Sequence, residues 1–194
     1  GFCGTYNLEH ADDPLTDEKT LETKALAMAE ETGGLNQLHT IGIVTGCFAD
    51  EKLLVRNLKM VRRVFSRYGF CGEIQYVGSQ LTSKESITEL AQDGPFSLYL
   101  TIEVFSKRTE LMKKQKSSLT LDSARDLLGY TRSVGANSSF LYIAGLDSLE
   151  TYREELPNFR DVINRFPQIQ TYQLYSPGQI IYRETEALGL DYFI

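Results

Sequence analysis

Residues 96–105 read FSLYLTIEVF and form the longest β-rich stretch of the chain. Aromatic and β-branched residues of this kind suit the pleated surface of a strand. A segment rich in lysine, with its densest cluster at residues 113–116, follows the stretch and is expected to be a solvated connection rather than a mobile lid. A helical pattern then spans about 121–134 and ends at Gly135.

The same alternation of strand and helix recurs on both sides of this stretch. Apolar runs predict further strands at 39–44, 71–77, 139–144 and 169–175. Helical patterns predict helices at 16–32, 50–69, from 82 onward, at 147–166 and at the end of the chain. The run 39–44 has no polar face and is expected to be buried on both sides. Strands that alternate with long helices imply right-handed crossovers and a parallel sheet.

Local signals mark the ends of these helices. The start signals are Asp13-Pro14, Asp50, the capping box at 82–85 and the run 147–150. Gly33-Gly34 and Gly69 are the expected stop signals of the first two helices. Pro157 interrupts the fifth helical pattern, which is expected to resume as far as Phe166.

The order of elements predicts an α/β fold. One more strand is expected before Gly1, because the opening loop and first helix have no strand to leave from. Six βα units would then form an open three-quarter (βα)6 barrel, a partial TIM-type barrel. No linker or shift in composition divides the chain, so residues 1–194 are expected to be a single domain, truncated at its N-terminus.

Composition excludes several classes of protein. The net charge is −6 and no strong basic block is present, which disfavours nucleic-acid binding. The longest apolar runs are far shorter than the roughly 20 residues needed to span a bilayer, so no membrane association is expected. Three cysteines without close pairing argue against a disulfide framework and favour a reducing, cytoplasmic compartment.

The ends of the predicted strands gather the candidate chemistry. They carry Thr45-Gly46-Cys47, Gly78-Ser79-Gln80, Glu103, Gly145-Leu146-Asp147 and Tyr175-Ser176. In barrels of this kind the active site lies at the carboxyl ends of the strands. Glycine at a strand end either makes the turn or lets a ligand approach the backbone closely, and both interpretations stay open.

Glu103 and the cysteines are the most specific of these residues. Glu103 lies inside an apolar strand, where a carboxylate is costly unless it is paired. Its partner is expected to be Arg108 or a nearby lysine, or else a ligand at the barrel mouth. Cys47 follows its strand and belongs at the top of the barrel. Cys71 precedes its strand, belongs at the bottom and is expected to be a buried structural thiol.

With these residues the chain resembles the radical S-adenosylmethionine (radical SAM) enzymes. Gly1-Phe2-Cys3 matches the end of the Cys-x-x-x-Cys-x-aromatic-Cys loop that binds a [4Fe–4S] cluster in that family, with the first two cysteines expected before Gly1. The resemblance implies that Cys3 is a metal ligand and that the cofactors are the cluster and S-adenosylmethionine. It also implies reductive cleavage of S-adenosylmethionine to a 5′-deoxyadenosyl radical, which abstracts hydrogen from a small-molecule substrate.

The resemblance also assigns roles to residues at the strand ends. Thr45, Gly46 and Cys47 occupy the place of the family's glycine-rich motif that contacts the methionine amino group, although they depart from its usual Gly-Gly-Glu. Glu103 and Arg108 would hold the ribose and carboxylate and are the expected catalytic pair. The remaining residues implied to border the cofactor are Phe2, Gly145, Leu146 and Tyr175. A reductant such as flavodoxin or ferredoxin would be the electron-donating partner.

Two other functions remain open. The chain could be a cluster-free βα-barrel enzyme, such as a lyase or aldolase, with Glu103 as acid and base. It could also be a non-catalytic relative that retains affinity for S-adenosylmethionine without turnover. The two histidines, His10 and His39, are poor material for a catalytic triad or zinc site.

Overall fold

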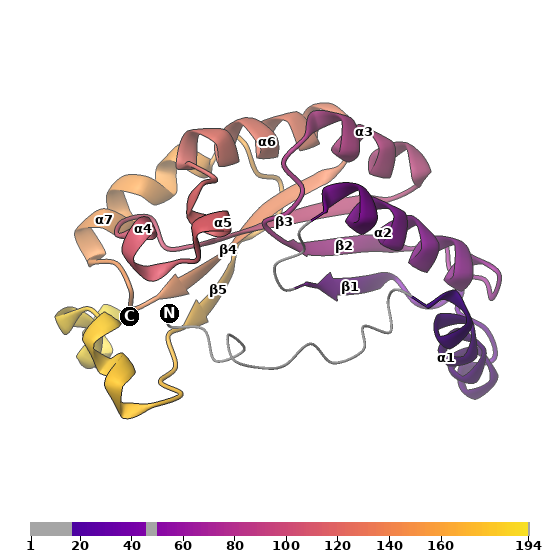
Figure 1. Cartoon of the computed structure of the whole chain (residues 1–194), viewed down its shortest axis with the longest axis horizontal. Coiled ribbons are helices and arrows are strands. Elements are labelled where there is room, and N and C mark those ends of the chain that lie inside the picture. The colour runs from indigo at the N-terminus through magenta and orange to yellow at the C-terminus, as the bar shows by residue number, and fades with distance from the viewer. Residues whose placement is uncertain (1–16, 46–49, 194) are drawn as a thin grey trace.

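A computed structural model describes residues 17–45 and 50–193 of the chain. Its centre is one sheet of five parallel strands, in which each strand pairs with its neighbours in sequence. The strands are β1 (Thr40–Val44), β2 (Glu73–Gly78), β3 (Phe96–Glu103), β4 (Asn137–Ala144) and β5 (Gln168–Thr171). The sheet is curled into a half barrel, and the helices cover its outer, convex face (Figure 1). The α/β class, the parallel sheet and a shape compatible with a partial barrel are therefore confirmed.

Helices connect the strands in the predicted order. They are α1 (Glu18–Thr32), α2 (Glu51–Ser66), α3 (Lys84–Asp93), α4 (Arg108–Leu111), α5 (Lys114–Ser117), α6 (Leu121–Ser133) and α7 (Leu149–Glu155). Short 3-10 helices follow as η2 (Leu156–Phe159), η3 (Pro177–Tyr182), η4 (Thr185–Leu188) and η5 (Leu190–Tyr192). Within the described part of the chain, no helix has the length and apolar character needed to cross a membrane.

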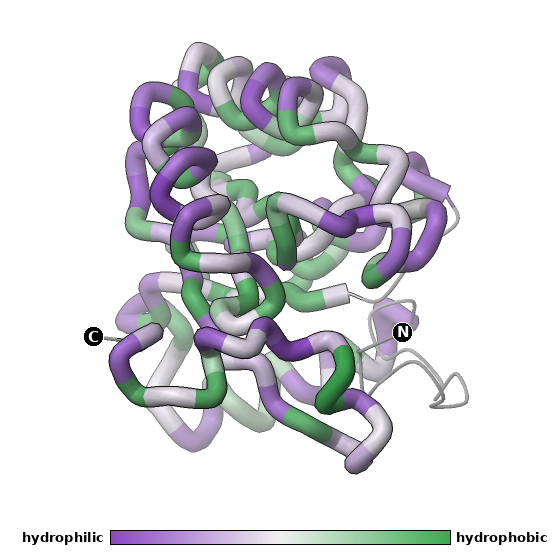
Figure 2. Tube along the Cα trace, turned by 90° about the vertical axis from the view of Figure 1, so that its left-hand side faces the viewer, coloured by the Kyte–Doolittle hydropathy of each residue, from purple (hydrophilic) through white to green (hydrophobic). Residues whose placement is uncertain are grey.

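The main core lies between the sheet and the outer helices. Alternate residues of β3 point into it, and the apolar stripe predicted for α2 meets them there. These residues are Phe96, Leu98, Leu100, Ile102, Leu54, Leu58, Val61 and Phe65. In Figure 2, hydrophobic segments lie mainly inside the molecule, and hydrophilic segments recur along its outer coils.

The other face of the sheet is the concave interior of the half barrel. Val77, Tyr99 and Leu141 form a small apolar cluster there, with the partly buried Ile143 packed against it. At β1 this face is open, because Val44 is 74% exposed. The prediction that the run 39–44 is buried on both faces is therefore wrong. Apolar content on both faces indicated a buried strand, but β1 pairs with β2 on one side and packs on helices with one face only.

The helix ends agree with the local signals at most positions. Asp50 accepts hydrogen bonds from the backbone N–H groups of Lys52 and Leu53, as expected of a cap. Gly33 ends α1 with φ 73°, a left-handed conformation that glycine adopts without steric cost. Asp17 caps the start of α1, whereas Asp13-Pro14 lies outside the described residues.

Two predicted helix starts are shifted by one residue. The cap of α3 is Ser83, which accepts from the N–H of Ser86, while the Thr82 hydroxyl donates to Glu51 instead. The cap of α7 is Ser148 rather than Asp147. In both cases the expected capping residue makes a contact distant in sequence, which a local pattern does not reveal.

The segment after α7 differs from the prediction. The helix ends at Glu155 and tightens into η2, so it does not resume to Phe166. Pro157 lacks the backbone N–H needed to continue an α-helix, which accounts for the change. The last strand stops at Thr171, four residues earlier than expected, and the terminal helix is a set of short 3-10 turns.

Cys71 lies before β2, at the amino end of the sheet as predicted, but it is exposed. The expectation of a buried structural thiol is therefore wrong. The residue precedes the first position of the strand, Glu73, and so lies outside the part of the strand that packs under the helices.

The packing of β3 against the helices leads to a first prediction. Leu100 is fully buried in the main core, so Leu100→Ala is expected to lower the free energy of unfolding by about 2–5 kcal/mol. The matched control is Leu190→Ala, because Leu190 is 79% exposed and its loss should change stability by about 0.5 kcal/mol or less. Urea denaturation of both variants measures the difference. Equal effects would contradict this description of the core.

Candidate functional site

Glu103 ends β3 in an unusual backbone conformation. Its φ is 64°, in the left-handed region, and the register between β3 and β4 shifts at this point, as in a β-bulge. A non-glycine residue in this region costs on the order of 1 kcal/mol or more and persists only where its surroundings enforce it. The residue is also buried. The bulge therefore re-aims a carboxylate at the carboxyl end of the central strand.

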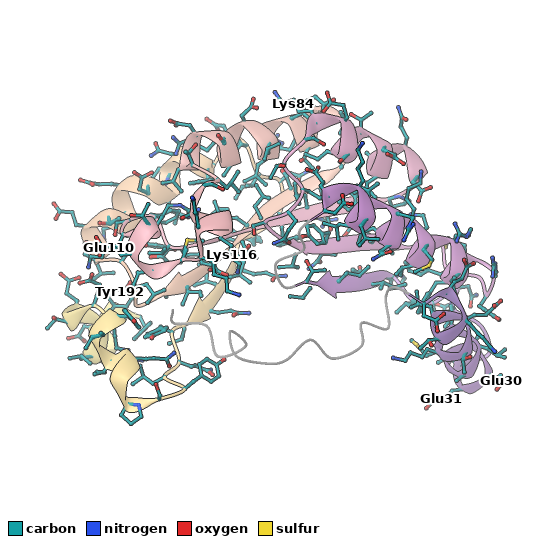
Figure 3. All side chains as sticks on the ribbon, in the orientation of Figure 1. Glu30, Glu31, Lys84, Glu110, Lys116 and Tyr192 are labelled. Atoms are coloured by element: carbon teal, nitrogen blue, oxygen red, sulfur yellow. The ribbon has the colours of Figure 1, made fainter. Side chains whose placement is uncertain are left out.

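Lys116 is the partner of this carboxylate. Its Nζ lies 2.5 Å from Oε1 of Glu103, and the two side chains are 18% and 12% exposed. Sequence left Arg108 and a nearby lysine as alternatives, and the structure selects the lysine. The segment expected to be a plain solvated connection thus forms two short helices, and one of its lysines reaches the site (Figure 3).

Arg108 binds backbone rather than a carboxylate. Its Nη1 donates to the carbonyls of Ile102 and Val104, both at 2.7 Å, and its Nη2 donates to those of Leu119 and Lys116 at 2.9 and 3.3 Å. Burial lowers the pKa of Arg108, while the nearby carboxylates oppose that shift. Arg108 therefore fixes the loop 104–119 onto the end of β3. Its predicted role toward a ligand stays a prediction.

Asp147, which the sequence placed both at the end of a predicted strand and at a helix start, binds the N–H groups of the same loop. It is completely buried and accepts from the N–H groups of Phe105 and Ser106 at 2.7 and 2.8 Å. It also accepts from the hydroxyls of Ser106 and Tyr142, at 2.5 and 3.1 Å. Burial, followed by the charge of Asp147, raises the pKa of Tyr142. The sequence signal that could have indicated this role of Asp147 is an acidic residue two positions after a strand-end glycine.

The backbone groups of Gly145, the predicted glycine at the end of β4, are hydrogen-bonded by the C-terminal segment of the chain. The N–H of Gly145 donates to the hydroxyl of Tyr192 at 3.0 Å, and its carbonyl accepts from the N–H of Glu184 at 2.9 Å. Its φ of 107° favours glycine, and an added Cβ would lie 3.3 Å from that of Tyr172. Leu146 is buried beside it in an apolar cluster. Gly145 and Leu146 therefore contact the C-terminal segment in this structure.

Tyr175 lies in that C-terminal segment and is largely exposed. Its N–H donates to Oε1 of Gln179 at 2.8 Å, so the described contact is a turn within the segment. Phe2, Cys3, Gly46 and Cys47 lie outside the described residues, and their predicted roles stay predictions.

A polar cluster joins the ends of β1 and β2. Oε1 of Gln80 accepts from the hydroxyls of Tyr76 and Thr45, at 2.6 and 3.2 Å, and these two hydroxyls lie 3.1 Å apart. A Cβ on Gly78 would lie 2.0 Å from the Tyr76 hydroxyl. The absence of a side chain at Gly78 therefore leaves room for the Tyr76 ring, a role that was not predicted from the sequence. Thr45 lies at the strand end, as predicted.

Two buried hydroxyls of β3 have no hydrogen-bond partner within the described part of the chain. They belong to Ser97 and Thr101, which are 0% and 7% exposed. Each unmade hydrogen bond of a buried group costs about 1–3 kcal/mol. Alternation along the strand places Thr101 on the face opposite to the main core, near the apolar cluster of Val77, Tyr99 and Leu141. Thr101 thus adds an unused donor two residues before Glu103.

The described residues supply hydrogen-bonding groups rather than a metal centre. Among residues 17–45 and 50–193, no group of three or more His, Cys, Asp or Glu side chains is arranged to hold a metal ion. No protein-family model matches the sequence, and no curated protein matches it significantly.

The role of Asp147 can be tested by a change of one atom. Asp147→Asn keeps the shape but turns one acceptor into a donor that faces backbone N–H or hydroxyl groups. We expect the free energy of unfolding to fall by about 3 kcal/mol. Asp161→Asn, at an exposed position, is the control and should be nearly neutral. Thermal and urea unfolding measure both, and a neutral Asp147→Asn would show that these contacts do not hold the loop.

The close approach of Tyr76 to Gly78 can be tested with a matched pair of glycine variants. Gly78→Ala forces the Tyr76 ring out of its position and is expected to cost about 1–3 kcal/mol. Gly42→Ala, on β1, meets no atom within 4 Å and should be neutral or slightly stabilising. Denaturation curves compare the two. A Gly78→Ala variant as stable as Gly42→Ala would show that the Tyr76 side chain does not need the space at Gly78.

Proposed function

We propose that this chain is the core of a radical SAM enzyme that binds S-adenosylmethionine at the carboxyl end of the half barrel. The observation that carries the proposal is Glu103, a recessed carboxylate held by a strained backbone at the end of the central strand. Strained residues of this kind concentrate at ligand sites. The parallel half barrel with helices outside, and the order of its βα units, support the same proposal.

The residues around Glu103 suit a nucleoside. Its carboxylate would accept hydrogen bonds from ribose hydroxyls or from the methionine amino group. The Thr101 hydroxyl, which has no partner among the described residues, would supply another hydrogen bond. Val77, Tyr99 and Leu141 form a buried apolar cluster on the inner face of the sheet, which would supply the apolar part of the site. Such a mixture, mostly apolar with a few placed polar groups, is typical of small-molecule sites.

The cluster in this proposal depends on Cys3, which lies outside the described residues. When bound, a [4Fe–4S] cluster would supply the electron that cleaves S-adenosylmethionine to a 5′-deoxyadenosyl radical, which takes hydrogen from a small-molecule substrate. A flavodoxin- or ferredoxin-like protein would deliver the electron. The part of the chain described here would orient the nucleoside.

A decisive experiment starts from the complete gene product, reconstituted anaerobically with iron and sulfide. We expect bound iron and, with dithionite, release of 5′-deoxyadenosine from S-adenosylmethionine. Cys3→Ala should lose the iron. Glu103→Gln should keep the iron but bind S-adenosylmethionine at least about tenfold more weakly, because one acceptor of the carboxylate is lost.

Glu110→Gln is the matched control for Glu103→Gln, since Glu110 is an exposed carboxylate in the loop after β3 (Figure 3). It should leave both iron content and affinity unchanged. Protein that binds neither iron nor S-adenosylmethionine after reconstitution would refute the proposal.

The ion pair at the end of β3 favours one second candidate, a cluster-free lyase or aldolase. A lysine 2.5 Å from a carboxylate at a barrel mouth has the residue types for carbonyl chemistry, with Glu103 as acid and base. Iron content distinguishes the two functions, because only the first requires a cluster.

A further inference from the structure

The Glu103–Lys116 ion pair lies where the proposed ligand would bind. Its two charges are largely removed from solvent, and the carboxylate belongs to a residue in a strained conformation. A buried ion pair gives little net stability compared with apolar packing, because both charges lose their hydration. Stability of the fold therefore does not by itself account for placing these charges here.

The loop that carries Lys116 is held without this ion pair. Arg108 binds the backbone carbonyls of Lys116 and Leu119, and Asp147 binds the N–H groups of Phe105 and Ser106. The backbone at Lys116 is thus fixed by other groups. The lysine side chain, with its four methylene groups, can leave Glu103 by rotation while α5 stays in place.

The buried hydroxyl of Thr101 is an unsatisfied polar group on β3, close in sequence to Glu103. Thr101 lies two residues before Glu103 on β3, and its hydroxyl has no hydrogen-bond partner among residues 17–45 and 50–193. Lys116 satisfies the carboxylate but leaves this hydroxyl unsatisfied. A ligand with several hydroxyl groups has separate donors and acceptors for the carboxylate and for the Thr101 hydroxyl.

We propose that the Lys116 ammonium is a built-in competitor that occupies Glu103 until S-adenosylmethionine displaces it. The inference rests on the proposed function and adds a residue that sets the affinity of the site. The ligand must break the ion pair before it reaches Glu103, so the apparent dissociation constant equals the intrinsic one divided by the fraction of molecules in which the pair is open. Ligands that replace Lys116 must offer donors, such as hydroxyl or ammonium groups, to the carboxylate.

Binding of S-adenosylmethionine by calorimetry tests the competitor directly. Lys116→Met keeps the length of the side chain and removes its charge. We expect it to bind S-adenosylmethionine at least about fivefold more tightly than the unaltered protein. Lys114→Met changes an exposed lysine of the same short helix and should bind with unchanged affinity. Unchanged or weaker binding by a folded Lys116→Met variant would overturn the inference and leave the proposed function intact.

A second measurement needs no variant and covers the case in which Lys116→Met does not fold. Brief acetylation followed by peptide mass spectrometry compares the reactivity of Lys116 with that of Lys114 in the unaltered protein. We expect the ratio to rise severalfold when S-adenosylmethionine is added, because the Lys116 ammonium is released from Glu103. A ratio that stays the same or falls overturns the inference. Absence of binding in the unaltered protein and in every variant would refute the proposed function and this inference together.

Discussion

The buried carboxylate of Asp147 is the interaction on which the carboxyl end of the sheet depends. It follows β4, yet its donors are in the loop after β3, so it joins the ends of two neighbouring strands. A buried charge is costly unless hydrogen bonds satisfy it, and Asp147 accepts four. The loop between Glu103 and Lys107, both with left-handed φ, is held in its conformation by these bonds.

Arg108 completes this arrangement from the other side of the loop. Asp147 takes the N–H groups of the loop, and Arg108 takes the carbonyls of Ile102, Val104 and Leu119. The carboxylate of Asp147 thus satisfies backbone donors of the loop, and the guanidinium of Arg108 satisfies backbone acceptors. In the described hydrogen bonds the two side chains do not pair with each other. The carbonyl of Asp147 also accepts from the Tyr192 hydroxyl, which extends the network to the C-terminal segment. The position of Glu103 is therefore a consequence of many satisfied groups around it.

Sequence predicted the elements of the fold well because its strongest signals are local. The apolar stripe of α2, its cap Asp50 and the stop at Gly33 depend on spacing within one or two turns, and all are confirmed. The partner of Glu103 was left open between Arg108 and a lysine, because the answer depends on a bulge and on the backbone of a loop. The cap at Ser83 was not predicted because it also depends on a contact distant in sequence: the Thr82 hydroxyl donates to Glu51 on another helix.

The strand-end glycines show how a correct pattern can have a different cause. Sequence analysis left open whether they make turns or admit a ligand. Gly145 does make a turn, with φ 107°, and it is also hydrogen-bonded to Tyr192 and Glu184, whereas Gly78 makes room for the Tyr76 side chain. In the described part of the chain, the groups at the carboxyl end that lack such a use are few. Among the described residues the Thr101 hydroxyl has no partner and the Glu103 carboxylate is paired with Lys116, so the end of β3 is where the proposed ligand would find groups to bind.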